Sequence, residues 1–537
     1  MPRSHASHPE NLPRLWLIFL AVFAAVLAAH LPLLRLPYYW DEAGYYIPAA
    51  YDFFRTGSLI PYSTLSNAHP PLPSIYLALW WKLLAFAPWV TRLAMCVLSS
   101  LALLAVYQLA IATTQKPRVA IATAVLTAIY PVWFAQSSLA HADMFAAAAT
   151  LWAIVFFLEE RLCLTALCFS LAALSKETAI VTPIALAVWQ AWLAFAPRRW
   201  KPASEVFRHS RLAKAGTLLL PVLPLACWYI YHWHRTGFVF GNPEYLRYNA
   251  TATLTPLRVL LAFAHRVMHI AVHMNMFVPV LSMLACMMLP PVDGRKRISI
   301  NNQLLFYVII LANLLFFSVL GGALLTRYLL PLYPLVLLVC VNTFYRRLRQ
   351  WHWLIALSAV AFVAGLFVNP PYRFAPEDNL AYRDVILLHE AAIRQIEAHY
   401  PDATVLSAWP ATDELSKPEL GYVKASMQIA SIDNFSLLQI EKAAQLSDPY
   451  TVGLIFSTKY DPPHLPFNLG RRNETLDARF FDFHRDLPPE IIAHLLGGKV
   501  VWRAARQGQW AAVLHFDHPQ LAMQTQDGLL PLHYNQP

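Results

Sequence analysis

Residues 15–34 read LWLIFLAVFAAVLAAHLPLL, and residues 35–42 continue as RLPYYWDE. The first stretch has no charged side chain and is long enough to cross the hydrocarbon core of a bilayer as a helix. It is too long and too poorly terminated for a cleaved signal peptide. We therefore expect it to remain as a first membrane helix, followed directly by the acid pair Asp41-Glu42.

Apolar runs of this kind recur along the chain. Of the 537 residues, 58% are hydrophobic and 13% are charged, whereas soluble domains carry roughly 25% charged residues. This composition excludes a secreted disulfide scaffold, a disordered protein and an ordinary cytosolic enzyme. The sequence predicts a mainly α-helical polytopic membrane protein with about eleven transmembrane helices, near 15–34, 90–112, 118–136, 142–158, 161–174, 178–195, 215–232, 268–289, 303–320, 328–343 and 351–368.

Basic residues gather in the short loops on one side of these predicted helices. Because Lys and Arg accumulate on the cytoplasmic side, the pattern places the N-terminus in the cytoplasm. The loops assigned to that side contain Lys116, Arg118, Arg161, Arg198, Arg199, Lys201, Arg208, Arg211, Lys214, Arg295, Lys296, Arg297, Arg346, Arg347 and Arg349. The short loops opposite hold only Lys176 and Arg327. The net charge of +10 is thus a topology signal, and no nucleic-acid partner is predicted.

Two long loops, at about 35–89 and 233–267, are predicted on the outer side, where the C-terminal part also lies. Residues 1–370 form the predicted membrane domain, and residues 371–537 form a small extracytoplasmic α/β domain. Its expected helices cover 378–399 and 435–447, and its expected strands cover 403–408, 427–432, 451–457, 499–504 and 510–516.

Ionisable residues occur at the outer ends of several predicted helices. These residues are the pair Asp41-Glu42, His69, Asp143, Lys176 and Arg327. Each has an ordinary explanation, such as a charge that favours the helix dipole or a side chain that reaches to the interface. Charges at membrane depth are costly, however, and they mark functional sites by default. Their shared face predicts one outer vestibule.

These motifs together resemble those of the GT-C class of polyprenyl-phosphate-sugar-dependent glycosyltransferases. The branch is that of the protein O-mannosyltransferases, the lipid A aminoarabinose transferase and RgtA/B/C/D-like enzymes. The resemblance covers about residues 12–370 and rests on Trp40-Asp41-Glu42, His69-Pro70-Pro71-Leu72, Arg92, Pro131 through Asp143, Ser175-Lys176-Glu177 and Arg327-Tyr328-Leu329-Leu330-Pro331. The aminoarabinose transferases have Lys-Pro-Pro where this chain has His69-Pro70-Pro71, and a basic residue where it has Ala43-Gly44.

The resemblance implies transfer of a hexosyl or pentosyl group from a polyprenyl-phosphate donor. A phosphate leaves as a stabilised anion, so the reaction needs one carboxylate base and cations for the phosphate rather than the carboxylate pair of a glycosidase. Asp41 is the predicted base. His69, Lys176 and Arg327 are predicted on the phosphate side, while Glu42 and Asp143 orient sugar or acceptor. A single displacement would invert the anomeric carbon.

No cofactor is predicted, and dependence on a divalent metal stays open. His265, His269 and His273 recur at a spacing that stacks them on one helix face. Such spacing is also found in metal sites, but without a nearby carboxylate in sequence we favour a structural or vestibule-lining role.

Two other functional classes compete with an enzyme. A lipid-linked sugar transporter or flippase would favour charges near the bilayer midplane and internal repeats, neither of which the sequence shows. A membrane scaffold would leave the outer charges without a purpose. The sequence therefore favours an enzyme of a bacterial inner membrane, with a lipid-linked sugar donor and an envelope glycan, lipid or protein as acceptor.

Overall fold

The computed structural model describes residues 11–195, 205–241, 243, 247, 254–446, 449–460, 462, 475, 478–481 and 484–516. Of the predicted cytoplasmic charges, Arg198, Arg199 and Lys201 lie outside these residues. Contacts divide the chain into two units. The first runs to Arg383 and includes residues 461–483, and the second contains residues 384–460 and 484 onward. This division differs from the predicted boundary at 370/371.

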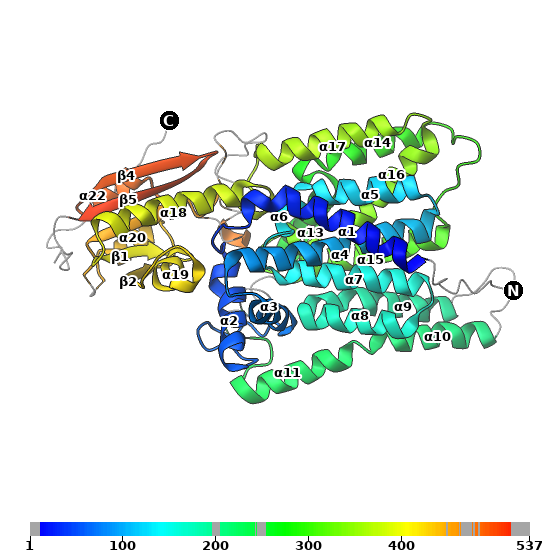
Figure 1. Cartoon of the computed structure of the whole chain (residues 1–537), viewed down its shortest axis with the longest axis horizontal. Coiled ribbons are helices and arrows are strands. Elements are labelled where there is room, and N and C mark those ends of the chain that lie inside the picture. Colours follow the sequence, from blue (N-terminus) through cyan, green and yellow to red (C-terminus); the bar gives the residue numbers. More distant parts are fainter. Residues whose placement is uncertain are drawn as a thin grey trace. The chain divides into compact units, whose positions relative to one another are not determined.

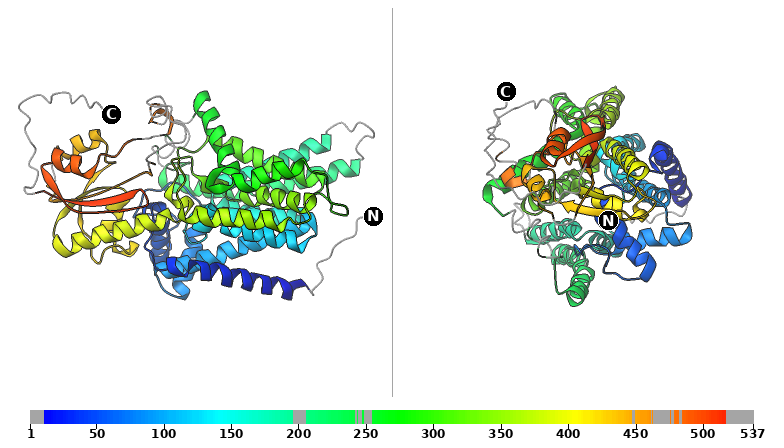
Figure 2. Two further views of the ribbon diagram at one scale, coloured as in Figure 1. Left: turned by 90° about the horizontal axis from the view of Figure 1, so that it is seen from above. Right: turned by 90° about the vertical axis from the view of Figure 1, so that its left-hand side faces the viewer.

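The first unit is a bundle of helices that run side by side (Figure 1, Figure 2). Six of its described helical segments are long and apolar enough to cross a membrane: Leu15–Leu33, Pro88–Thr114, Glu177–Phe195, Arg208–Thr236, Pro256–Asn275 and Ile300–Val319. Five shorter apolar helices accompany them. The predicted fold class, a helical polytopic membrane protein with a small C-terminal sheet domain, is confirmed.

The helices of the first unit have the following bounds. They are α1 (Asn11–His30), α2 (Ile47–Thr56), α3 (Leu72–Leu83), α4 (Pro88–Thr114), α5 (Pro117–Ile129), α6 (Pro131–Gln136), α7 (Ala142–Leu158), α8 (Leu162–Ser175), α9 (Val181–Phe195), α10 (Glu205–Leu219), α11 (Val222–Thr236), α13 (Pro256–Ala271), α14 (Phe277–Met287), α15 (Ile300–Val319), α16 (Tyr333–Arg347) and α17 (His352–Phe367). Short turns η1 (Leu31–Leu33), η2 (Glu42–Tyr46), η3 (Glu177–Ile180), η5 (His273–Asn275), η6 (Thr326–Leu329) and η7 (Pro376–Asp378) lie between them.

Several of the predicted membrane helices differ in their bounds from the helices of the structure, and two are interrupted by clear breaks. The run 118–136 is broken at Pro131, which has no backbone N–H and cannot continue a helix from the residues before it. The run 268–289 is also broken, because Met274 adopts a left-handed backbone conformation with φ of 48°. The helix before this break, α13, starts at Pro256, well inside the predicted outer loop 233–267.

The break at Met274 is packed closely against α17. Asn275 donates a hydrogen bond of 2.7 Å from Nδ2 to the carbonyl oxygen of Ala361. A Cβ on Gly365, one turn along α17, would stand 3.1 Å from Pro131 Cγ and 3.2 Å from Asn275 Nδ2. The glycine thus lets both helix breaks approach the same face of α17.

The second unit contains a five-stranded sheet in the order β2-β1-β3-β5-β4. Its strands are β1 (Thr404–Ala408), β2 (Gln428–Ile432), β3 (Val452–Phe456), β4 (Gly498–Arg506) and β5 (Gln509–Phe516). The first three are parallel, and β5 pairs antiparallel with both β3 and β4. Helices α18 (Ala381–His399), α19 (Ala411–Ser416), α20 (Leu437–Ala443) and α22 (Pro489–Leu495) and the turn η8 (Pro418–Leu420) accompany the strands.

We predict that Gly365→Val lowers the stability of the membrane unit by about 1–3 kcal/mol, because the added carbons overpack the contact with Pro131 and Asn275. The matched control is Gly216→Val in α10, where a Cβ has nothing within 4 Å. Both variants change helix propensity alike, so thermal unfolding in detergent isolates the packing effect. Equal melting temperatures of the two variants would contradict the close approach.

Candidate functional site

Glu42 is completely buried and fully hydrogen-bonded. Arg92 of α4 donates to both of its carboxylate oxygens. The backbone amides of Tyr39 and Ala140 donate to the same carboxylate over 2.9 and 2.6 Å. Arg92 and two backbone amides therefore hold the Glu42 carboxylate at a fixed position.

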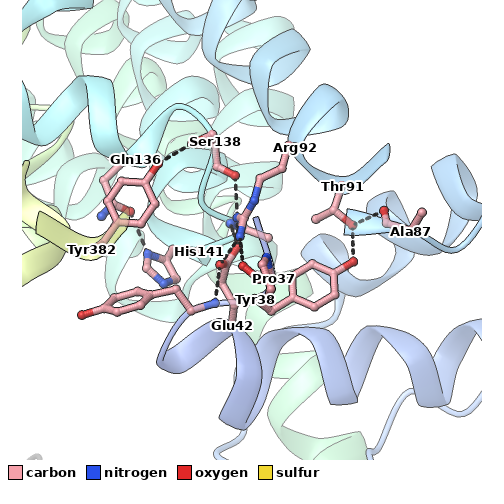
Figure 3. Close-up of polar contacts among 12 residues, drawn as sticks. Pro37, Tyr38, Glu42, Ala87, Thr91, Arg92, Gln136, Ser138, His141 and Tyr382 are labelled. Atoms are coloured by element: carbon pink, nitrogen blue, oxygen red, sulfur yellow. Dashed lines mark hydrogen bonds and ion pairs between the residues drawn. The ribbon is translucent and has the colours of Figure 1, made fainter. Parts of the chain in front are cut away.

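Arg92 extends this contact to two further segments. It donates to the carbonyl oxygens of Pro37, over 2.9 Å, and Ser138, over 2.8 Å, and Figure 3 shows its guanidinium among these groups. The pair Glu42–Arg92 thus joins the segment after α1, helix α4 and the turn before α7. This junction fixes the backbone of the neighbouring residue, Asp41.

Arg327, in the turn before α16, lies among three carboxylates. It donates to Asp41 from Nη2 and to Glu377 from Nη1 over 2.5 Å. Its Nε lies 3.2 Å from Asp143 Oδ2. These acids come from the segments after α1, before α18 and at the start of α7, so one guanidinium gathers residues that are far apart in sequence.

Lys176 supplies the second cation of this cluster. Its Nζ donates to Asp143 Oδ1 over 2.6 Å and lies 3.9 Å from the centre of the Tyr328 ring. Arg266 of α13 lies 5.5 Å from the same ring centre. Tyr328 is therefore in contact with two cationic side chains, an arrangement that is electrostatically favourable.

The three carboxylates around Arg327 differ in exposure. The side chain of Asp41 is 19% exposed, whereas those of Asp143 and Glu377 are 2% and 4% exposed. Asp41 is consequently the member of the cluster that a substrate reaches most easily.

Glu377 has an unusual protonation equilibrium. The pKa of Glu377 is raised to about 8: burial is the largest cause, the charge of Arg327 opposes it, and the charges of Asp41, Asp378 and Asp143 add to the increase. Carboxylates that share one site cannot all ionise at low cost. Glu377 is thus the group that holds a proton near neutral pH.

His69 lies beside the cluster of Arg327. Its Nδ1 is 2.8 Å from Glu177 Oε2, and its ring is stacked with that of Tyr46 at 6.0 Å. A small pocket of about 40 Å³ opens next to His69, and Tyr46, Ser175 and Trp228 are among the residues that line it. The structure thus brings Asp41, Asp143, Lys176 and Arg327 into direct contact, whereas Glu42 and His69 belong to adjoining pairs.

Glu377 and Arg266 belong to this site but were not among the residues predicted from the sequence. Glu377-Asp378 is an acid pair after the last predicted membrane helix, as Asp41-Glu42 is after the first, and this symmetry was an available signal. Arg266 is a completely buried cation in the amphipathic helix α13. An arginine inside a membrane segment is itself a functional signal.

The histidine series of α13 and η5 lies in the surroundings of this site. His273 lies 2.9 Å from Asp378 Oδ2 and 3.1 Å from the Tyr372 hydroxyl. The rings of His269 and His273 are 5.5 Å apart, and those of His265 and His269 are 6.4 Å apart. Within the described residues, no group of three metal-ligating side chains is close enough to hold an ion.

Comparison with known proteins supports the class that the sequence indicated. A family described as dolichyl-phosphate-mannose-protein mannosyltransferase matches residues 68–228, a segment that contains His69, Asp143 and Lys176. Among curated proteins, none matches the chain significantly in sequence.

Solved structures extend the likeness to most of the chain. The crystal structure of ArnT from Cupriavidus metallidurans bound to undecaprenyl phosphate is 16% identical, with a TM-score of 0.51, and its apo form is 14% identical, with a TM-score of 0.52. Each match covers 93% of this chain and 97% of ArnT. The chain thus has the ArnT-like GT-C fold, and the predicted resemblance to GT-C glycosyltransferases is confirmed.

We predict that Arg92→Gln destabilises the membrane unit by about 3–5 kcal/mol, because it leaves the buried carboxylate of Glu42 without its cation. The control is Arg161→Gln, which removes an exposed partner of Glu159 and should cost at most about 1 kcal/mol. Thermal unfolding of both variants in the same detergent measures the difference. Similar small losses in both would show that Glu42 does not depend on Arg92.

Proposed function

We propose that this protein is a membrane glycosyltransferase that moves a sugar from a polyprenyl-phosphate donor to an acceptor at the outer face of the membrane. The observation that carries the proposal is one accessible carboxylate, Asp41, held in place by a buried arginine beside two further cations. The family match and the ArnT structure bound to undecaprenyl phosphate support the donor class.

Asp41 acts as the general base in this proposal. It is partly exposed, and Arg327 fixes the direction of its carboxylate. A base must lie within hydrogen-bonding reach of the acceptor hydroxyl. Glu42 cannot reach a substrate in this arrangement, because it is fully buried and its oxygens are occupied. We therefore assign Glu42 a positioning role.

Lys176, His69 and Arg266 form the phosphate side of the proposed site. Cations beside the leaving phosphate stabilise the charge that develops when the glycosidic C–O bond breaks. Lys176 and Arg266 both lie near the ring of Tyr328, and Arg266 Nη2 has no hydrogen-bond partner in the described part of the chain. Arg327 is instead engaged by three carboxylates, so we assign it to positioning Asp41 rather than to binding phosphate.

A transporter of lipid-linked sugars fits these positions less well. Asp41 immediately precedes the turn η2, Lys176 directly follows α8, Asp143 is in the first turn of α7, and Arg327 precedes α16. These charges lie at helix ends, whereas transporters tend to place them in broken helices near the bilayer midplane. The sugar and the acceptor, whether glycan, lipid or protein, are the questions for experiment.

We predict that Asp41→Asn lowers the transfer rate by about 100-fold or more, because it removes the base without changing the side chain's size. The protein would be supplied with a panel of polyprenyl-phosphate sugars and an envelope extract, and release of polyprenyl phosphate would be followed by mass spectrometry. Asp293→Asn, at the other end of the membrane unit, is the matched control and should match the wild type.

Three outcomes would contradict all or part of the proposal. Equal release by the wild type and Asp41→Asn would remove Asp41 as the base. A product with retained anomeric configuration would contradict the single displacement, which inverts that centre. If the wild type moves donors across a bilayer but releases no polyprenyl phosphate in the presence of acceptor, the transporter alternative replaces the enzyme.

The pKa of Glu377 near 8 predicts a pH-dependent rate. Below that pH the carboxyl is protonated, and above it the new charge competes with Asp41 for Arg327, so the wild-type rate should fall at high pH. Glu377→Gln mimics the protonated form and should stay within about threefold of the wild type at pH 7 without the high-pH loss.

Rates measured between pH 6 and 10 check this prediction. Glu390→Gln is the control, since burial raises the pKa of this carboxyl in the second unit too. Its profile should match that of the wild type. An unchanged high-pH loss in Glu377→Gln would show that another group is responsible.

A further inference from the structure

A basic pocket lies at the end of the membrane unit opposite to the cluster of Arg327. It is formed where α14 ends, where α15 begins at Ile300 and where α16 ends at Arg347. Helix α15 is about 30 Å long, and its other end, at Val319, adjoins the loop that leads to Arg327. The pocket has a volume of about 520 Å³ and is lined by Arg295, Lys296, Arg297 and Arg346 with Ser299, Ile300 and Asn301.

The charge of this pocket is of one sign. Its lining contains four cationic side chains and no carboxylate. Among the residues that the structure describes, none of these four cations has an ion-pair partner. The Nε of Arg346 is buried and has no hydrogen-bond partner there either. Like charges held together without counter-ions attract an anion.

The pocket is built by hydrogen bonds rather than by loose surface side chains. Arg295 donates to the carbonyl oxygens of Tyr345, over 2.5 Å, and Leu348, over 2.7 Å. Its guanidinium also lies 4.6 Å from the centre of the Tyr345 ring. These contacts fix the connection between α14 and α15 against the end of α16.

The first turn of α15 completes the lining. The hydroxyl of Ser299 caps the helix by accepting from the amide of Asn302 over 3.2 Å. The amides of this turn have no carbonyl partner within the helix, and the helix dipole is positive at this end. A phosphate in the pocket would meet both the helix terminus and the cationic side chains.

Apolar side chains lead away from the pocket along α15. Ile300, Leu304 and Tyr307 are all exposed and follow one another at helical spacing on one face. Met287 and Met288, at the end of α14, are exposed as well. An anion with a hydrocarbon tail would therefore contact both the charged lining and this apolar face, whereas free phosphate would use only the first.

We propose that this pocket binds the phosphate headgroup of an anionic phospholipid, with an acyl chain along Ile300, Leu304 and Tyr307. The ligand is a membrane lipid at the end of the unit away from the sugar-transfer site, so the proposal does not depend on the function proposed above. The predicted topology places this pocket on the cytoplasmic side, where the negative leaflet surface attracts basic residues.

The test compares two variants that remove equal charge from the same predicted side. Arg297→Gln/Arg346→Gln alters the pocket, and Lys116→Gln/Arg118→Gln alters another short loop that does not line it. Binding of phosphatidylglycerol and phosphatidylcholine to purified protein in detergent would be measured by native mass spectrometry. The pocket variant should bind phosphatidylglycerol about tenfold more weakly or worse, the control variant should match the wild type, and phosphatidylcholine should bind weakly to all.

A second variant shows whether weaker binding comes from the pocket itself or from misfolding of the first variant. Asn301→Asp adds a carboxylate to the first turn of α15, where a negative charge favours the helix, and should still weaken phosphatidylglycerol binding. Equal weakening in the pocket and control variants would overturn the proposal in favour of diffuse surface charge. Equal binding of phosphatidylcholine, or displacement of phosphatidylglycerol by millimolar inorganic phosphate, would also overturn it.

Discussion

One guanidinium holds the candidate site together. Arg327 is buried, and it contacts Asp41, Asp143 and Glu377, which come from three separate parts of the chain. Without this cation the three acids would repel one another in a medium that screens charge poorly. The fold therefore supplies a second cation, Lys176, and leaves Glu377 with a raised pKa, so that the cluster is close to neutral.

A second buried ion pair, Glu42–Arg92, fixes the backbone that carries Asp41 into this cluster. The pair Glu42–Arg92 fixes the segment after α1, so the most accessible acid, Asp41, is the neighbour of the least accessible one. This contrast is the basis on which we propose different roles for two adjacent carboxylates. Glu42 is fully buried and hydrogen-bonded, which suits a positioning role, whereas Asp41 is partly exposed, which suits a base.

The sequence predicted the fold class and several residues that the structure brings together in the candidate site, but not all of them. The low content of charged residues predicted a membrane protein. Charged residues at the ends of the predicted helices identified Asp41, Asp143, Lys176 and Arg327 as candidates. Glu377 was not predicted as a site residue, because it lies beyond the last apolar run and the local sequence does not show that the chain returns to Arg327. The helix break at Met274 was not predicted, because the segment AVHMNMF contains neither Gly nor Pro. The backbone conformation of this segment is set by packing against α17.

Arg327 is central to the proposed mechanism because it acts through Asp41. A double-mutant cycle on the transfer rate, with Arg327→Lys, Asp41→Asn and the double variant, tests this dependence most directly. If Arg327 serves to hold the base, the double variant should be no more than about threefold slower than Asp41→Asn alone. If the two losses multiply instead, Arg327 acts on the substrate independently, and its assignment as the residue that positions Asp41 is wrong.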